Sequence, residues 1–313
     1  MSRRRRIVRV PASSANLGPG YDVLGAALDI ELELEVSEGE GFSVDAGGLP
    51  VPTGRDNLVV RSFERLHPAE DIAFRIGGDV PLGRGLGSSA SAIVAGLLAA
   101  DHLYELGHSR ESIFRLATEI EGHPDNVAAA LFGGVVVCGP PGLTPKGSAP
   151  DPIELGSGIE STSDASLPAL LTPPEGLEAI LVIPGEEVST EAARAALPVE
   201  VPIADAAFNV GAASQLVLGI ERSDLGLIER GLADRLHQPH RRPLYPRSME
   251  IVEAAPGLGA IGATISGAGP TVLVWSYWQS GAKVSEGLAP LCEGWAEVRR
   301  VPFSARGARV EIP

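Results

Sequence analysis

The chain has 313 residues, enough for one large domain or two of ordinary size, and its 44% hydrophobic and 21% charged content is that of a globular protein with a core. The formal net charge of −15 argues against broad nucleic-acid binding, which needs a basic surface. No run approaches the ~18 apolar residues of a membrane span, no signal sequence is recognisable, and the two cysteines form no CxxC pair, so we expect a cytoplasmic protein without zinc or disulfides.

Alternating apolar and acidic side chains in "DIELELEV" predict a strand over residues 29–36 with one buried face. Shorter strands are predicted at 73–76, 134–138, 178–183, 271–275 and 296–303. Helices are predicted at 89–104, 110–122, 190–197, 204–221, 225–233 and 248–255. Ser109 and Ser189 stand where helix N-caps are needed. Because strands and helices mix without a regular βαβα order, the sequence predicts an α+β fold.

Residues 139–174 break this pattern, because they are rich in proline, glycine and serine and have little periodicity. We interpret them as a domain junction or a long excursion near one, with the boundary near residue 165. The predicted domains are therefore residues 1–165 and residues 166–313. No role follows for the loose stretch 140–172, and the basic run at residues 3–6 is interpreted as a solvated tail.

The stretch "PLGRGLGSSASAIVAG" at residues 81–96 places three glycines and two serines directly before an apolar run. Glycines spaced in this way let backbone N–H groups approach a ligand closely. A helix that begins straight after such a loop offers further N–H groups and its positive dipole end to an anion. The loop therefore predicts phosphate binding, although a glycine-rich surface turn is as good an interpretation of the loop alone.

Familiar nucleotide and hydrolase signatures do not fit this loop. The Gly-Lys-Ser/Thr of Walker loops is absent, as are the His-Arg-Asp and Asp-Phe-Gly of protein kinases. The glycine spacing is not G-x-G-x-x-G, and neither G-x-S-x-G nor HExxH occurs. What remains is a phosphate loop that uses serine hydroxyls and backbone amides instead of a lysine.

Two further stretches indicate which family uses such a loop. They are "PASSANLGPGYD" at residues 11–22 and "TISGAGPT" at residues 264–271. In this order the three stretches resemble the three motifs of the GHMP small-molecule kinases, whose middle motif, Pro-x-x-x-Gly-Leu-Gly-Ser-Ser-Ala, is matched at every specified position. Within that superfamily, "EIEGHPDNVAAALFGG", "VSTEAARAALP" and "LHQPHRRPLYP" resemble the homoserine kinases.

The resemblance implies two α+β domains, an N-terminal one of the ribosomal-S5-like kind and a ferredoxin-like C-terminal one, with the site between them. It implies transfer of phosphate from ATP, with Mg²⁺, to the side-chain hydroxyl of L-homoserine on the way to threonine. Family members are often homodimers, and we expect no nucleic-acid or membrane partner.

The nucleotide side of the site follows from the same resemblance. The expected phosphate loop comprises Pro81, Leu82, Gly83, Arg84, Gly85, Leu86, Gly87, Ser88, Ser89, Ala90 and Ser91. The Ser89 hydroxyl and one carboxylate would face Mg²⁺, which takes few protein oxygens. Glu121 is the expected carboxylate and Glu119 the alternative, while a solvated helix face is the other interpretation of both. Asn57 is a weaker candidate for contact with the base or ribose.

The substrate side would bind an amino acid. Arg194 and Arg241 match the family's substrate arginines, and the guanidinium fork suits a carboxylate. Arg242 is an alternative to Arg241, and an exposed arginine such as Arg194 is often only solvated. Asn16 and Asp22 suit the ammonium and the side-chain hydroxyl. His123, Thr190, Gly267 and Gly269 complete the expected pocket.

Asn126 aligns with a position where several relatives have a catalytic aspartate. An amide accepts no proton, so the resemblance implies that Asn126 orients the attacking hydroxyl without acting as a base. Asp125 is the alternative acid, one residue away. The chain also departs from the family pattern at Tyr21 for phenylalanine, Ala129 for proline and Gln238 for glutamate, and the last change removes a charge that could orient the substrate arginine.

Two other functions stay open at this point. A kinase of the same fold could act on another small alcohol, such as mevalonate or a sugar, but those substrates have no α-ammonium for Asp22. A non-catalytic ligand-binding relative would be expected to lose Ser89, the helix acid or Asn126, and this chain keeps all three.

Overall fold

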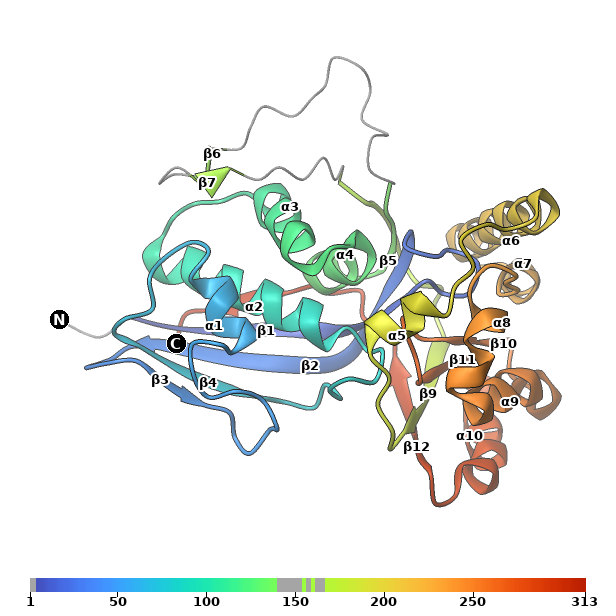
Figure 1. Ribbon diagram of the computed structural model, residues 1–313. Coiled ribbons are helices and arrows are strands. Elements are labelled where there is room, and N and C mark those ends of the chain that lie inside the picture. The colour runs from blue at the N-terminus through green and yellow to red at the C-terminus, as the bar shows by residue number, and fades with distance from the viewer. Residues whose placement is uncertain (1–3, 140–153, 156–158, 161–166) are drawn as a thin grey trace, which may run out of the picture.

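The computed structural model describes residues 4–139, 154–155, 159–160 and 167–313. Two sheets with helices packed against them make up most of it (Figure 1). The α+β prediction is confirmed. The predicted domain boundary at residue 165 and most of the stretch 140–172 lie outside the described residues. In the basic run, Arg5 and Arg6 belong to the first strand and Arg6 is 7% exposed, so the interpretation of residues 3–6 as a solvated tail is wrong.

The first sheet has the strand order β13-β1-β2-β4-β3, and β5 and β8 extend it beside β2. Among the described strands of this sheet, β3 and β4 pair in parallel and the other pairs are antiparallel. The strands are β1 (Arg5–Ala15), β2 (Leu24–Glu38), β3 (Ser43–Asp45), β4 (Ile72–Gly78), β5 (Val135–Val137), β8 (Ala169–Leu171) and β13 (Arg309–Glu311). The predicted strand 29–36 is the middle of β2, and its apolar residues are buried as the alternation indicates. A small separate hairpin is formed by β6 (Glu154–Leu155) and β7 (Ile159–Glu160).

Four helices cover one face of this sheet (Figure 1). They are α1 (Leu58–Phe63), α2 (Ser88–Tyr104), α3 (Arg110–Glu121) and α4 (Pro124–Phe132). The Ser109 hydroxyl accepts from the backbone N–H of Ser112 at the start of α3, so that predicted N-cap is confirmed. α1 and α4 were not predicted. α4 begins at Pro124, and proline is accepted at the first position of a helix because its missing N–H has no partner there.

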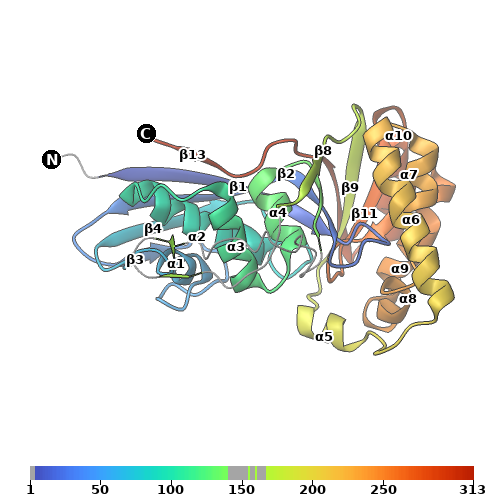
Figure 2. The same cartoon turned by 90° about the horizontal axis from the view of Figure 1, so that it is seen from above.

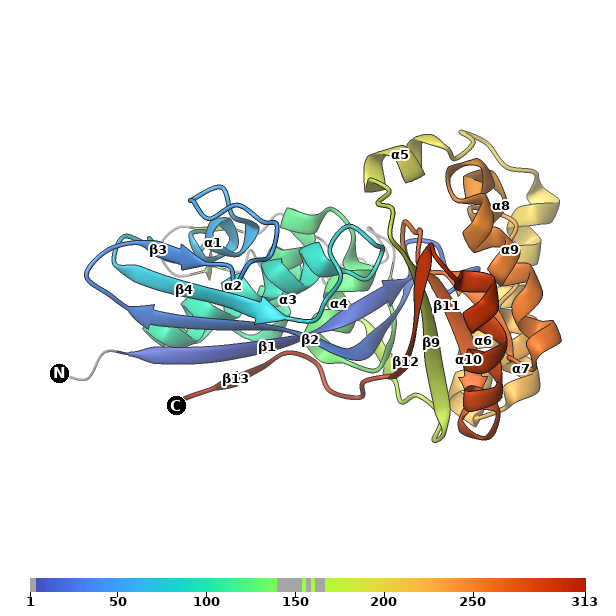
Figure 3. The same cartoon turned by 90° about the horizontal axis from the view of Figure 1, so that it is seen from below.

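The second sheet is antiparallel, with the strand order β10-β11-β9-β12. Its strands are β9 (Leu177–Pro184), β10 (Gly262–Ile265), β11 (Val272–Tyr277) and β12 (Ala296–Pro302). Side chains such as Val182 and Val274 pack toward α9 (Pro246–Ala254) and α10 (Trp278–Cys292), whereas Leu181 and Trp275 belong to the core of the first sheet. Both faces of the second sheet are therefore buried, and Figure 3 shows β1 and β2 ending against it.

The remaining elements lie at the outer side and at the junction. Two packed helices, α6 (Ile203–Arg222) and α7 (Leu225–Gly231), flank the second sheet (Figure 2). α5 (Thr190–Ala195), α8 (Gln238–Arg241), η1 (Arg242–Leu244) and η2 (Ala255–Leu258) are short. The chain returns to the first sheet through β13, which pairs with β1, so both ends of the described chain lie at that sheet (Figure 3).

Among the described residues one helix, α6, is long and apolar enough to cross a membrane by length and composition alone. Its sequence is not an uninterrupted apolar run, because polar residues such as Asn209 and Gln215 lie among the apolar side chains. Core helices of soluble proteins can have the same length and composition. Asn209 is buried and hydrogen-bonded within the protein, as described below.

Candidate active site

The predicted phosphate loop, Pro81 to Ser91, follows β4 and runs into the first turn of α2, whose N-cap is Gly87. Gly83, Gly85 and Gly87 all have φ between +63° and +75°, a left-handed conformation that favours glycine. A Cβ added at Gly85 would lie 2.3 Å from the carbonyl oxygen of Ser266, and one at Gly87 would lie 2.0 Å from the Ser13 Oγ. The glycines are thus needed to pack the loop against β1 and the loop after β10.

A cavity of about 270 Å³ lies in front of this loop, where the two sheets meet. Most of the predicted site residues line it. They are Asn16, Asp22, Gly83, Gly85, Gly87, Ser88, Ser89, Glu121, His123, Asn126, Thr190, Arg194, Arg241 and Gly267. Tyr21 and Asp125, the departure and the alternative acid named above, line it as well. Gly269 lies outside the lining, in a turn where its N–H bonds the Ser266 carbonyl.

Glu121 and Ser89 meet at the floor of the cavity. Ser89 Oγ, in the first turn of α2, donates to Glu121 Oε1 at the end of α3 over 2.6 Å. Burial raises the pKa of Glu121, and the hydrogen bond from Ser89 and the charge of His123 act in the opposite direction without cancelling the shift. Glu119, by contrast, forms an ion pair with Arg65 away from the cavity. A hydroxyl and a carboxylate oxygen are ligand types that suit Mg²⁺.

The start of α4 places three polar side chains on the cavity wall. Asn126 Oδ1 accepts from Ser13 Oγ at 2.9 Å. Asp125 Oδ1 accepts from the backbone N–H of Asn126 at 2.7 Å and lies 3.5 Å from His123 Nδ1. Burial would lower the pKa of His123, but the nearby carboxylates of Asp125 and Glu121 outweigh it, so this pKa is raised.

The opposite wall carries Tyr21, Asp22 and Arg194. Arg194, on α5, donates through Nη1 and Nη2 to the two carboxylate oxygens of Asp22, and Nη1 also bonds the Tyr21 hydroxyl at 2.9 Å. The N-cap of α5 is Ser189, whose hydroxyl accepts from Ala192, so this predicted cap is also confirmed. Tyr21 thus adds a polar contact that phenylalanine would lack.

The two neighbouring arginines of the "HRRP" stretch have different surroundings. Arg241 is 2% exposed, and it donates through Nε to the Ala193 carbonyl and through Nη1 to the Gly267 carbonyl, both at 3.0 Å. Arg242 points away and pairs with Glu253 on the surface. The structure therefore brings Arg241, and not Arg242, to the cavity.

Asn16 and Gln238 hold backbone around the cavity. Asn16 Nδ2 donates to the Gly267 carbonyl at 2.9 Å, and its Oδ1 accepts from the N–H of Asp22. Gln238 Oε1 accepts from the N–H of Ile265 in β10 at 2.7 Å. The side chain at position 238 therefore anchors the second sheet through a hydrogen bond that a glutamate oxygen could also accept.

A second, mostly apolar cavity of about 200 Å³ lies on the other side of the helix start and shares Ser88 and Ser89 with the first. Leu82 and Asn57 line it. The Asn57 amide is already used within the protein, because Oδ1 accepts from Val59 N at the start of α1 and Nδ2 donates to the Pro52 carbonyl. Sequence analysis did not find this cavity, since its apolar residues come from five separate segments of the chain.

Comparison with known proteins agrees with this arrangement. The GHMP kinases N terminal domain model matches residues 57–134, and the GHMP kinases C terminal model matches residues 216–296. A homoserine kinase of Prochlorococcus marinus (strain MIT 9515) is 35% identical over 96% of this chain and 93% of its own length. A homoserine kinase of Thermus thermophilus is 38% identical over 84% of each chain.

The chain belongs to the homoserine kinase family. The crystal structure of homoserine kinase from Cytophaga hutchinsonii ATCC 33406 superposes with a TM-score of 0.81 at 27% identity, over 98% of each chain. The two-domain GHMP kinase fold and the kinase activity that the sequence predicts are thereby confirmed. L. major mevalonate kinase, solved with R-mevalonate, shares only the fold, with a TM-score of 0.65 at 16% identity.

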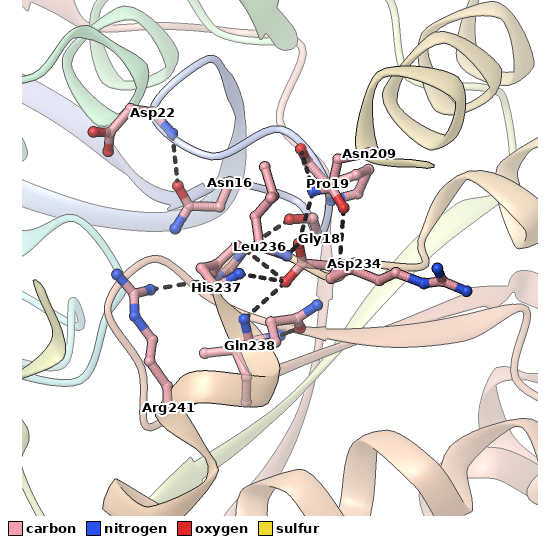
Figure 4. Close-up of polar contacts among 12 residues, drawn as sticks. Asn16, Gly18, Pro19, Asp22, Asn209, Asp234, Leu236, His237, Gln238 and Arg241 are labelled. Carbon is pink, nitrogen blue, oxygen red and sulfur yellow. Dashed lines mark hydrogen bonds and ion pairs between the residues drawn. The ribbon is translucent and has the colours of Figure 1, made fainter. Parts of the chain in front are cut away.

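Sequence analysis missed one pair of buried polar residues beside the cavity. Asp234 and His237 lie before α8 and close to each other, and His237 contacts Gly18 in the loop that follows β1 (Figure 4). The only signal was an acid and a histidine three residues apart, a spacing that occurs in many loops.

Proposed function

We propose that this chain is an ATP-dependent kinase that phosphorylates the side-chain hydroxyl of L-homoserine, giving O-phospho-L-homoserine and ADP. The observation that carries the substrate assignment is the meeting of Asp22, Arg194 and Arg241 with the glycine loop in one cavity. An acid and two arginines suit the ammonium and the carboxylate of an amino acid. Mevalonate and sugars have no ammonium for Asp22, which disfavours the alternative small-alcohol substrates.

In this proposal the loop from Pro81 to Ser91 binds the phosphates of ATP through backbone N–H groups at the start of α2. The apolar cavity next to Ser88 and Ser89 takes the adenine base. Ser89 and Glu121 hold Mg²⁺, which neutralises phosphate charge when bound. Ser89, which lines both cavities, already donates to Glu121, which lines the first, so a hydroxyl and a carboxylate lie together there.

The reaction forms a bond between the homoserine hydroxyl oxygen and the γ-phosphorus, breaks the bond from that phosphorus to the ADP oxygen, and releases the hydroxyl proton. Such transfers depend mainly on positioning and on charge stabilisation. Asn126, held by Ser13, would orient the hydroxyl, and Arg194, Arg241 and Asp22 would fix the other end of the substrate. As part of the same proposal, the enzyme works in the cytoplasm as a homodimer and supplies threonine synthesis.

A coupled assay of ADP release with L-homoserine, L-threonine, L-serine and mevalonate tests the proposal. L-homoserine should give the highest kcat/KM, and omission of Mg²⁺ should abolish turnover. The Ser89→Ala variant, purified in parallel, measures the background from contaminating kinases. A higher kcat/KM for mevalonate, or wild-type turnover no higher than this background, would contradict the proposal.

A further inference from the structure

A buried polar cluster lies directly behind Arg241, between α8, α6 and the loop after β1 (Figure 4). Asp234 is its anchor. The two carboxylate oxygens accept from Asn209 Nδ2 and from the backbone N–H groups of Leu236 and Gln238, each at 2.8 Å. A carboxylate with this many donors is held in one orientation.

His237 connects this anchor to both substrate-facing segments. Its side chain is fully buried, with Nε2 2.7 Å from the Gly18 carbonyl oxygen and 3.5 Å from Asp234 Oδ2. Its other nitrogen, Nδ1, lies 3.3 Å from Arg241 Nη1. A guanidinium can only donate and a carbonyl can only accept, so only one protonation form satisfies both contacts, the neutral imidazole with its proton on Nε2.

The contacts of Arg241 show why the protonation form of His237 matters. Its guanidinium is oriented by the carbonyls of Ala193 and Gly267 and by His237 Nδ1, and none of these three acceptors carries a charge. An arginine held by neutral acceptors keeps its positive charge for a ligand anion. The direction of the guanidinium therefore depends in part on His237 staying an acceptor.

We infer that His237 is a positioning residue for the substrate carboxylate: it fixes the guanidinium of Arg241 and ties α8 to the loop of residues 16–22. That loop carries Asn16 and Asp22, so one imidazole sets the spacing between the segments proposed to bind opposite ends of the amino-acid group. The inference rests on the proposed function and adds a residue that acts through Arg241 and does not touch the substrate.

Protonation of His237 would break this arrangement. The charged and titratable groups that face it are Asp234, Arg241, Asp22 and Tyr21. Burial lowers the pKa of His237 and Arg241 acts in the same direction, and together they outweigh Asp234, the Gly18 carbonyl and Asp22. Below that lowered pKa, an Nδ1–H would face the guanidinium donor, so homoserine binding should weaken at acid pH.

Two variants can each replace the hydrogen bond of one imidazole nitrogen. In His237→Asn the amide oxygen can replace Nδ1 as the acceptor for Arg241, whereas in His237→Gln the amide nitrogen can replace Nε2 as the donor to Gly18. We expect His237→Gln to raise the KM for homoserine by about tenfold or more, the scale of a lost hydrogen bond to a charged group. We expect His237→Asn, which keeps the contact to Arg241 but loses the one to Gly18, to raise this KM less than His237→Gln does, and kcat and the KM for ATP to change little in either.

His240→Asn is the matched control, because His240 is an exposed histidine on the same short helix. In an Arg241→Ala background, His237→Gln should add almost nothing to the KM for homoserine. The rise in this KM at acid pH should be present in wild type and absent in His237→Asn. The inference would be overturned if the Asn and Gln variants had equal KM values for homoserine, or if their KM values changed only in line with their Tm. It would also be overturned if the effects of His237→Gln and Arg241→Ala on this KM were additive.

Two outcomes distinguish a failure of this inference from a failure of the proposed function. Wild-type protein that does not phosphorylate homoserine contradicts the proposed function, whereas active wild type with an unchanged KM in His237→Gln contradicts only the role of His237. If the variants do not fold, ¹⁵N spectra of histidine-labelled wild type decide. A neutral Nε2–H form of His237 at pH 7 supports the inference, and an Nδ1–H or doubly protonated form overturns it.

Discussion

The guanidinium of Arg194 donates two hydrogen bonds to the carboxylate of Asp22, with Nη1–Oδ2 at 3.1 Å and Nη2–Oδ1 at 2.9 Å. The two side chains are 41% and 36% exposed, so solvent screens the pair and its net contribution to stability is at most about 1 kcal/mol. A homoserine molecule would offer a carboxylate to Arg194 and an ammonium to Asp22. The substrate can therefore replace this contact at little cost.

We predict that the two cavity arginines differ in their effect on substrate use. Arg241→Ala should lower kcat/KM for homoserine by a factor that corresponds to a free-energy loss of roughly 2–5 kcal/mol, the scale for truncating one partner of a buried charge pair. Arg194→Ala should cost less, because Arg194 is 41% exposed. The KM for ATP should hardly change in either variant. Steady-state kinetics with each substrate varied in turn provide the measurement.

The α-amide of homoserine identifies the group that the arginines bind. Wild type should use the amide much less well than the acid, and the arginine variants should lose most of this discrimination. Arg242→Ala is the control, since Arg242 pairs with Glu253 on the surface. Arginine variants that still distinguish acid from amide as wild type does would show that these residues do not hold the carboxylate.

Gly87→Ala should destabilise the protein more than Gly107→Ala. Both glycines have left-handed φ, +66° and +80°, so alanine costs about 1–2 kcal/mol of backbone strain at either position. Only at Gly87 would the new Cβ meet a neighbour, Ser13 Oγ at 2.0 Å, whereas at Gly107 nothing lies within 4 Å. The clash should add about 1–3 kcal/mol. Urea unfolding of both variants measures the difference, and equal losses would refute it.

Glu121→Gln should separate activity from stability. Burial raises the pKa of Glu121, which means that the charged carboxylate lowers the free energy of unfolding at neutral pH. Glutamine removes that charge, and its amide oxygen can still accept the hydrogen bond from Ser89. We expect a higher Tm without Mg²⁺ and a kcat lower by about 100-fold or more, because metal positioning contributes several kcal/mol to phosphoryl transfer. Glu119→Gln, at the pair with Arg65, should have near-normal kcat. The prediction fails if Glu119→Gln is the inactive variant.

The pair Glu119 and Glu121 shows where sequence analysis stops. Two residues apart on a helix are about 200° apart around its axis, so only one of them can face the cavity. The motif predicts a helix that carries an acid, but it does not predict how α3 is rotated about its axis relative to α2. That rotation is determined by packing. The adjacent Arg241 and Arg242 were ambiguous for the same reason.

Local patterns predicted local features well. The alternation of residues 29–36 gave the middle of β2, and serines gave the caps of α3 and α5. α4 was missed because its Pro-Asp-Asn start has the composition of a turn. The His237 contacts were missed because the Gly18 carbonyl, 219 positions earlier, is brought there only by the tertiary fold.

Asn126 and Asp125 remain to be distinguished by function, and their contacts differ. Asn126 Oδ1 is occupied by Ser13 Oγ, which leaves the amide N–H groups to orient a substrate oxygen. The Asp125 carboxylate accepts from the first turn of α4 and lies beside His123, so part of its role is to support the helix start. Asparagine at position 125 can still accept that backbone hydrogen bond.

We therefore predict that Asn126→Ala lowers kcat by on the order of 100-fold, the scale of a misplacement of about 1 Å in the reacting group. Asp125→Asn should keep substantial activity, because its loss of charge leaves the positioning amide in place. The measurement is kcat for both variants at saturating ATP, Mg²⁺ and homoserine, with circular dichroism to confirm folding. A folded but inactive Asp125→Asn together with an active Asn126→Ala would make Asp125 the base. An amide at position 126 cannot titrate, so in the mechanism proposed here no fall of kcat at acid pH comes from that residue.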